Sequence, residues 1–116
     1  MRGLNKIFLL GHIGQKPEIR RTSNENQYAE IRLATNRSYR TEEGWSELTD
    51  WHTIKVWGRL AELCSEHLEV GATVAVEGHL RSERWTTSAG EKRSRYIIFG
   101  EQVHFVRSQS KKEQAS

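Results

Sequence analysis

Residues 49–58 read Thr49-Asp50-Trp51-His52-Thr53-Ile54-Lys55-Val56-Trp57-Gly58. Their side chains alternate in character, as they do along a half-buried β-strand whose successive residues point to opposite faces. Ile54 and Val56 share one face and would be buried there. Trp51 and Trp57 share the other face, with Lys55 between them. The stretch therefore predicts a strand with one apolar face and one face that carries two indoles and a cation.

The two indoles suit a ligand with separate flat rings. At about 3.3 Å per residue, Trp51 and Trp57 stand about 20 Å apart, which is too far for them to stack on each other. Stacking of a base on an aromatic side chain contributes on the order of 1–3 kcal/mol and tolerates any base, while a neighbouring Lys attracts phosphate. Unpaired nucleobases fit this description. The alternative is that both tryptophans are packed at a subunit contact.

The composition limits the protein to one small domain, because 116 residues leave room for one modest core. Lys and Arg number 18 against 15 Asp and Glu, so the net charge is only +3 and the placement of cations matters more than their number. The one cysteine, Cys64, can form no internal disulfide, and the N-terminus lacks a long apolar signal region. Both features favour a reducing cytoplasm, and no apolar run is long enough to suggest a membrane role.

Two strands are expected before residues 49–58. Residues 4–13 read as a strand that is apolar on both faces, so the face with Phe8 and Leu10 needs a cover, which can be another copy of the chain. A break at residues 14–17 and a polar turn follow. Residues 28–36 then alternate between apolar and polar side chains, as expected when one face meets solvent or ligand.

One helix and two strands are expected after it. Apolar residues recur with helical spacing over residues 59–68, and alternation resumes over residues 72–80. Residues 81–93 read as a polar hairpin loop that holds Trp85 among basic residues, and residues 96–106 form a last strand. The expected order is β-β-β-α-β-β.

This order matches an all-β fold, the five-stranded oligonucleotide/oligosaccharide-binding (OB) barrel with one short helix between the third and fourth strands. Ligands of that barrel lie on the second and third strands and on two long loops, where the aromatic residues of this chain fall. We therefore expect an OB-fold domain over residues 1–107 and a short disordered polar tail over residues 108–116.

Several blocks of the chain follow a family pattern in the same order. The blocks are Arg2-Gly3-Leu4-Asn5-Lys6, Gly11-His12-Ile13-Gly14-Gln15-Lys16-Pro17-Glu18, Asp50-Trp51-His52, Trp57-Gly58-Arg59-Leu60-Ala61-Glu62, and Glu77-Gly78-His79-Leu80-Arg81 followed by Trp85. In these blocks the chain resembles the bacterial single-stranded-DNA-binding protein family, over about residues 2–107. The resemblance implies the OB barrel, a homotetramer, and sequence-tolerant binding and protection of single-stranded DNA during replication, repair and recombination.

The resemblance places the base-stacking positions of the family on four aromatic residues, Tyr39, Trp51, Trp57 and Trp85. The family more often has Trp where this chain has Tyr39, and Phe where it has Trp57, so stacking is kept while the contribution of each position can differ. Trp45 has no dependable counterpart. It is as consistent with packing on the loop base as with an additional stacking ring, and it is left outside the expected site.

Cations beside these rings are candidates for phosphate contacts. The favoured ones lie within a few residues of a stacking ring and are Arg37, Lys55 and Arg84. The further candidates are Arg2, Lys6, Arg40, Arg59, Lys92 and Arg93. A lone surface Arg is more often only solvated, so not all of them are expected to take part. We hypothesise that Lys55→Ala lowers the salt slope of DNA binding by about one unit.

The expected subunit contact involves His52, Phe8 and Leu10. His52 faces away from the DNA side of its strand, and the resemblance puts that position at a subunit contact. An ordinary partly buried histidine is the alternative reading of His52.

Other classes of function find less support. The five histidines show no metal-ligand spacing, and Cys64 lies on the apolar side of the expected helix, so we expect no enzyme, no cofactor and no metal site. The alternative is a protein-interaction module of the same barrel fold, of the primosome-accessory type, with only weak nucleic-acid binding. Four ring positions beside cations argue against it. RNA binding stays open, because a stacking platform does not read the 2′-hydroxyl.

Members of the family usually continue into a Gly-, Pro- and Gln-rich linker with an acidic tip that recruits other genome-maintenance enzymes. This chain ends at Lys111-Lys112-Glu113-Gln114-Ala115-Ser116. Either the chain is naturally short or its tail was removed, so recruitment of those enzymes is doubtful. The resemblance also implies a cytoplasmic protein associated with the bacterial nucleoid, without a membrane partner.

Overall fold

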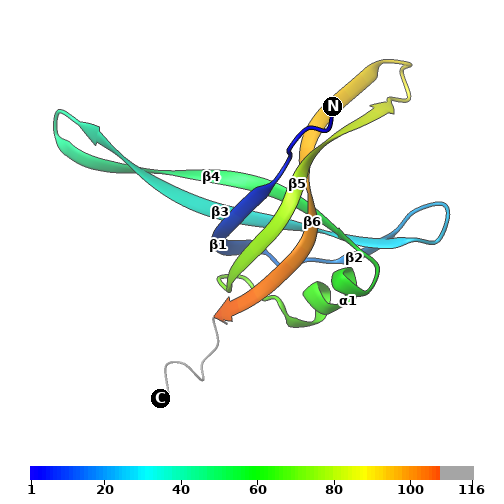
Figure 1. Cartoon of the computed structure of the whole chain (residues 1–116), viewed down its shortest axis with the longest axis horizontal. Helices are drawn as coiled ribbons and strands as arrows, with labels where there is room; N and C mark the ends of the chain where they lie inside the picture. The colour runs from blue at the N-terminus through cyan, green and yellow to red at the C-terminus, as the bar shows by residue number, and fades with distance from the viewer. Residues whose placement is uncertain (108–116) are drawn as a thin grey trace.

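Five long strands, one three-residue strand and one short helix build the fold in the computed structural model, which describes residues 1–107 (Figure 1). The tail expected over residues 108–116 lies outside the described residues. The elements are β1 (Ile7–Gln15), β2 (Ile19–Arg21), β3 (Gln27–Thr41), β4 (Gly44–Trp57), α1 (Gly58–His67), β5 (Thr73–Thr86) and β6 (Lys92–Arg107).

The strands close into a barrel. The sheet order is β1-β5-β6-β4-β3-β2, and β1 also pairs with β3, so the two ends of the five-stranded sheet meet. The β3–β4 and β5–β6 pairs are antiparallel, and a short parallel contact joins β4 to β6. With α1 between β4 and β5, this architecture confirms the predicted OB fold. The short strand β2, which was not expected, adds one strand to the edge of β3.

The core follows the predicted alternation. Ile54 and Val56 of β4 are fully buried, as are the inward residues of β3, while Trp51 of β4 is half exposed. The helix buries Ala61 and Cys64 against this core, as its apolar spacing predicted. Burial raises the pKa of the Cys64 thiol to about 11. Cys64 therefore stays protonated at neutral pH and fills space in the core.

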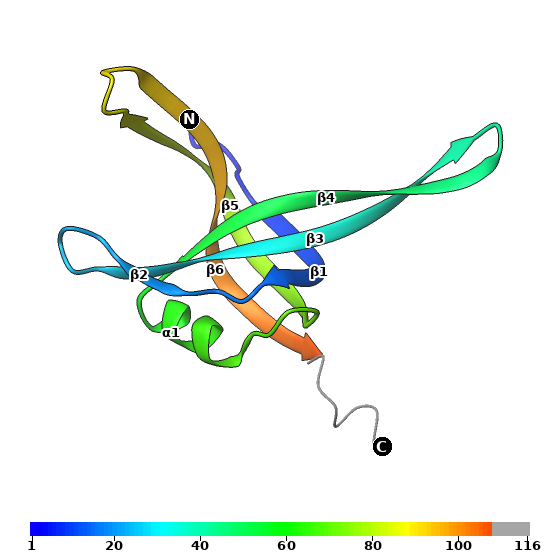
Figure 2. The same cartoon turned by 180° about the vertical axis from the view of Figure 1, so that it is seen from behind.

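Two long hairpin arms project from the barrel in different directions (Figures 1 and 2). The β3–β4 pair runs without interruption to Thr41↔Gly44, and the β5–β6 pair runs to Thr86↔Lys92. The prediction of a hairpin loop over residues 81–93 is therefore wrong, because Trp85 lies on β5. Both faces of each arm meet solvent, so the sequence there lacks the apolar alternation that marks a half-buried strand.

Barrel closure leaves no room for a side chain at Gly11, where β1 passes from β5 to β3. A Cβ atom at Gly11 would clash with the backbone carbonyl of Ala34. We predict that Gly11→Ala lowers the free energy of unfolding by about 1–3 kcal/mol, as overpacking does elsewhere, in urea titrations followed by circular dichroism. Gly3→Ala is the matched control, because nothing lies near its Cβ position. Equal stability of the two variants would contradict this account of the closure.

Candidate nucleic-acid interface

The outward face of the β3–β4 pair carries the predicted aromatic site. Residues that pair directly across an antiparallel ladder share a face. Trp51 pairs with Ala34, and Trp57 pairs with Tyr28. Because Ile54 and Val56 point into the core, both tryptophans point out of it, on the face that also carries Lys55. The structure thus brings together the two indoles and the cation that the sequence placed on one face.

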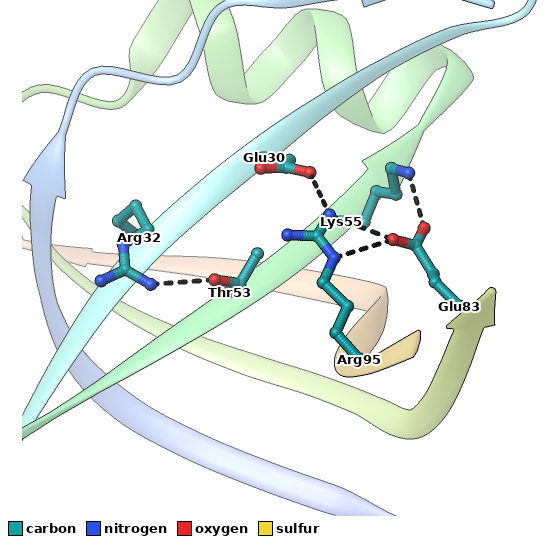
Figure 3. A network of polar contacts seen from close by, with 6 residues as sticks. All are labelled: Glu30, Arg32, Thr53, Lys55, Glu83 and Arg95. Carbon is teal, nitrogen blue, oxygen red and sulfur yellow. Dashed lines mark hydrogen bonds and ion pairs between the residues drawn. The ribbon is translucent and has the colours of Figure 1, made fainter. Parts of the chain in front are cut away.

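Trp51 is a fixed ring with an open side. Its indole lies so close to Gly14 of β1 that a Cβ atom there would clash with it. The guanidinium of Arg32 lies 5.4 Å from the ring centroid and donates a hydrogen bond of 2.9 Å to Thr53 Oγ1 (Figure 3). Half of Trp51 remains exposed. A ring held in place in this way can stack on a base at little cost in side-chain entropy.

Trp57 belongs to a second aromatic group that includes Tyr28. The two ring centroids lie 5.1 Å apart, with the planes tilted by 39°. Lys55 Nζ lies 4.5 Å from the Tyr28 centroid and 5.5 Å from the Trp57 centroid. Sequence reasoning missed Tyr28, although it directly precedes the alternating core residues of β3 and so has outward parity. Its contact with Trp57 depends on the register between the strands.

Four charged side chains join the β5–β6 pair to the barrel portion of the β3–β4 pair beside this group (Figure 3). Lys55 Nζ lies 2.7 Å from Glu83, and Arg95 contacts both Glu83 and Glu30 at 3.0 Å. These four residues come from β4, β5, β6 and β3. The Lys55 side chain is only 14% exposed. Lys55 thus lies on the face that carries the indoles, and its charge is balanced by Glu83.

Trp85 forms the third ring position, on the β5–β6 arm. It is 46% exposed and pairs with Arg93 in the ladder. Two neighbouring surface hollows share Trp85 and Arg84 in their lining, and Lys92 lines one of them. Within residues 1–107, Arg84 and Lys92 form no ion pair or hydrogen bond through their side chains. In the ladder these two uncommitted cations lie on the face opposite Trp85, and they meet it only where they line the same hollow at the edge of the arm.

Most of the other predicted cations are already engaged. Ion pairs join Lys6 to Glu101 at 3.4 Å, Arg37 to Asp50 at 2.9 Å, Arg59 to Glu62 at 2.9 Å and Arg93 to Glu91 at 2.8 Å. Arg40 lies 5.7 Å from the Trp45 ring centroid. Arg2 has no ion pair within the part of the chain that the structure describes. Sequence reasoning missed Arg32 and Arg95, which face the site from β3 and β6.

Tyr39 and Arg37 lie on the other face of the β3–β4 arm. Tyr39 pairs with Ser46, and Arg37 pairs with Leu48. Tyr39 is five residues along β3 from Ala34, the partner of Trp51, and an odd separation along a strand places two residues on opposite faces. The arm therefore presents these two expected site residues away from Trp51.

The residues expected at a subunit contact lie on the barrel wall. Phe8 and Leu10 of β1 are 67% and 62% exposed, and they line one surface hollow with Ala75 and His104. His52 is partly buried on the inward side of β4, where its Nε2 lies 2.8 Å from Thr35 Oγ1. His52 therefore faces away from the aromatic face, as expected.

Among residues 1–107, no three His, Cys, Asp or Glu side chains are grouped so that they could hold a metal ion. The described helix is too short and too polar to cross a membrane.

The closed barrel with an outward aromatic and basic face defines a protein of the OB-fold class. The model of the single-strand binding protein family matches residues 4–106, so the chain belongs to this family, as its sequence blocks suggested. Single-stranded DNA-binding protein 1 of Chlorobaculum tepidum is 39% identical to it over 94 residues, which are 79% of this chain and 58% of that relative. The chain thus spans little more than half of the length of this curated relative. Members of the family are binding proteins.

Two solved structures resemble the fold. A Plasmodium falciparum SSB in complex with ssDNA has a TM-score of 0.77 and 29% identity, over 91% of this chain and 97% of that chain. A small single-stranded DNA-binding protein from Streptomyces coelicolor has a TM-score of 0.65 and 25% identity, over 87% of this chain and 93% of that chain. The shared fold thus extends over most of this chain and nearly all of each of the two solved chains.

The Glu83 network predicts a pH-dependent stability. Burial alone would raise the pKa of Glu83, but hydrogen bonds from Lys55 and Arg95 outweigh it and hold the pKa below its usual value of 4.5. A carboxylate with a lowered folded-state pKa stabilises the fold above its unfolded-state pKa, and this stabilisation disappears as the pH falls through the folded-state pKa. Glu83→Gln should therefore cost on the order of 1 kcal/mol at pH 7 and progressively less below about pH 4.5.

Urea unfolding of wild type and Glu83→Gln between pH 7 and about pH 3 measures this difference. Glu42→Gln, at the tip of the β3–β4 arm, is the control and should unfold like the wild type at every pH. A deficit of Glu83→Gln that stays constant over the whole pH range would contradict the role assigned to the Glu83 charge.

Proposed function

We propose that this protein binds single-stranded DNA with little regard to sequence and protects it during replication, repair and recombination. The observation that carries the proposal is that exposed indoles lie close to cations: Arg32 lies over the Trp51 ring, and Arg84 and Lys92 line a hollow that Trp85 also lines. Membership of the single-strand binding protein family supports it. The name of the Chlorobaculum relative and the ssDNA in the Plasmodium complex point the same way.

The arrangement explains both the affinity and the tolerance of sequence. Every base has a flat face, so stacking on Trp51, on the Tyr28–Trp57 group and on Trp85 would contribute on the order of 1–3 kcal/mol per base whatever the sequence. Cations at the rim of these rings would hold phosphates. In a duplex, the bases are stacked on each other and their faces are not available, so this surface favours single strands.

The same barrel could serve as a protein-interaction module, and the apolar hollow at Phe8 and Leu10 would suit a protein partner. We assign that hollow to assembly of the chain with itself, most simply as the homotetramer that the family resemblance implies. A single-chain mass in sedimentation equilibrium would contradict this assignment. The cations beside Trp51 and Trp85 have no role in such a module, which is why DNA binding is the preferred function.

The proposed function also suggests the bounds of the domain and the cellular location of the protein. We take residues 1–107 as the DNA-binding domain. We place the protein in the cytoplasm, at the nucleoid, because its only cysteine is a buried free thiol and its proposed ligand is DNA. Fractionation that found the protein outside the cytoplasm would contradict this placement.

Tryptophan fluorescence tests the proposed function directly. Titration with oligothymidylate should quench the emission strongly at low salt, and the quenching should weaken as salt rises, because bound phosphates release counterions. A duplex of the same length should quench little. No quenching by the single strand at low salt would contradict the proposal and favour the protein-interaction module. Parallel titration with oligouridylate compares DNA with RNA.

Salt dependence separates the cations that touch phosphate from those engaged within the protein. We predict that Arg84→Ala lowers the slope of log Kobs against log salt by about one unit, as expected for one lost phosphate contact. Lys55→Ala should lower the slope by less than the one unit hypothesised from the sequence, since the Lys55 ammonium is paired with Glu83 at 2.7 Å. The reverse result would mean that DNA displaces Glu83 from Lys55.

A further inference from the structure

Strand β4 carries three tryptophans at equal intervals on one face. Trp45, Trp51 and Trp57 are each six residues apart, and residues at an even separation along a strand share a face. At about 3.3 Å per residue, the three rings are spread over about 40 Å of strand. The ladder between β3 and β4 is unbroken from Tyr28↔Trp57 to Arg40↔Trp45. The face that carries the proposed DNA site therefore continues to the tip of the arm.

Each of the three indoles lies beside a cation. The guanidinium of Arg40 lies 5.7 Å from the Trp45 ring centroid, and that of Arg32 lies 5.4 Å from the Trp51 centroid. Lys55 Nζ lies 5.5 Å from the Trp57 centroid. The unit of one flat ring and one positive charge, which suits one base and one phosphate, is thus repeated three times along the strand.

Trp45 is the most open ring of the three. It is 69% exposed, against 50% for Trp51. The sequence left open whether Trp45 packs onto the base of the loop, and so high an exposure leaves its ring free to stack. Tyr39, the neighbouring aromatic residue at the tip, lies on the other face of the arm with Arg37.

The surface between Trp45 and Trp51 leaves room for an extended strand. The side chains on that face are short and polar at Ser38, Asn36 and Thr49. Glu47, which pairs with Ser38, is the acidic side chain on this segment of the face. Arg40 and Arg32 at the two ends outnumber it, so the charge of the segment favours a polyanion.

We propose that Trp45 and Arg40 form a further base-stacking and phosphate-binding subsite for single-stranded DNA at the tip of the β3–β4 arm. The inference rests on the proposed function and extends it, because it lengthens the bound strand along β4. Three equally spaced pairs of an aromatic ring and a cation suit a polyanion with flat bases. Contact of the tip with a second protein molecule is the competing outcome of the test.

The test compares Trp45→Ala with Leu48→Ala, which removes an exposed apolar side chain from the opposite face of the same arm, and with Trp51→Ala. Affinities are measured by fluorescence anisotropy of labelled oligothymidylates of about 4 to about 16 nucleotides, the range of sites on single OB folds. Trp45→Ala should weaken binding of the longer strands by about 5- to 100-fold and leave the shortest unaffected. Leu48→Ala should change neither, and Trp51→Ala should weaken both.

Equal affinity of Trp45→Ala and wild type for every length, with Trp51→Ala impaired, would overturn the inference while the proposed function stood. A Trp45→Ala variant that altered only the mass of the assembly would also overturn it, in favour of a protein contact. No binding of any strand by the wild type would instead refute the proposed function. Thermal unfolding of each variant verifies the fold. A triple variant with Trp51→Phe, Trp57→Phe and Trp85→Phe keeps Trp45 as its one tryptophan. Quenching of its fluorescence by the longer strands supplies a second readout.

Discussion

The register between β3 and β4 determines both the core and the binding face. Its pairing sets Ile31 against Ile54 inside the barrel, and Ala34 against Trp51 outside it. Because side chains alternate with a period of two, a slip of one residue would expose Ile54 and bury Trp51. The core therefore holds the aromatic face in place, and the same ladder carries that face beyond the barrel into the arm.

The acidic residues of the site matter as much as its cations. Glu83 lies between Lys55 and Arg95, and Glu30 contacts Arg95 from β3, so two positive charges at the centre of the face are balanced within the protein. This network joins the β5–β6 pair to the barrel portion of the β3–β4 pair. Arg84 and Lys92 form no ion pair within residues 1–107 and lie farther out, on the β5–β6 arm. Under the proposed function, binding would depend on stacking at the centre of the face and on charge at its rim.

Sequence reasoning succeeded where burial leaves a periodic signal. The opposite faces of β4, the helix that buries Cys64 and the order of the five long strands were all predicted from apolar spacing, and the structure confirms them. It failed along the arms, because strands with two solvent-exposed faces show no alternation of apolar and polar side chains. The Tyr28–Trp57 contact and the Glu83–Lys55 pair join different strands, and no spacing within one strand reveals them. Tyr39 comes six residues after buried Leu33, so the two residues share a face if the strand continues that far. The sequence did not show that β3 extends to Thr41, so the face of Tyr39 could not be predicted.

Site-resolved NMR of the indole N–H groups tests the binding face most directly. The chain has four tryptophans, so a ¹⁵N-labelled sample gives four indole signals, which single Trp→Phe variants assign. Addition of oligothymidylate should shift the signals of Trp51, Trp57 and Trp85, and addition of a duplex should leave them nearly unchanged. If backbone signals elsewhere shifted with the single strand while these three indoles did not, DNA would bind another surface, and the account of this face as a stacking platform would be wrong.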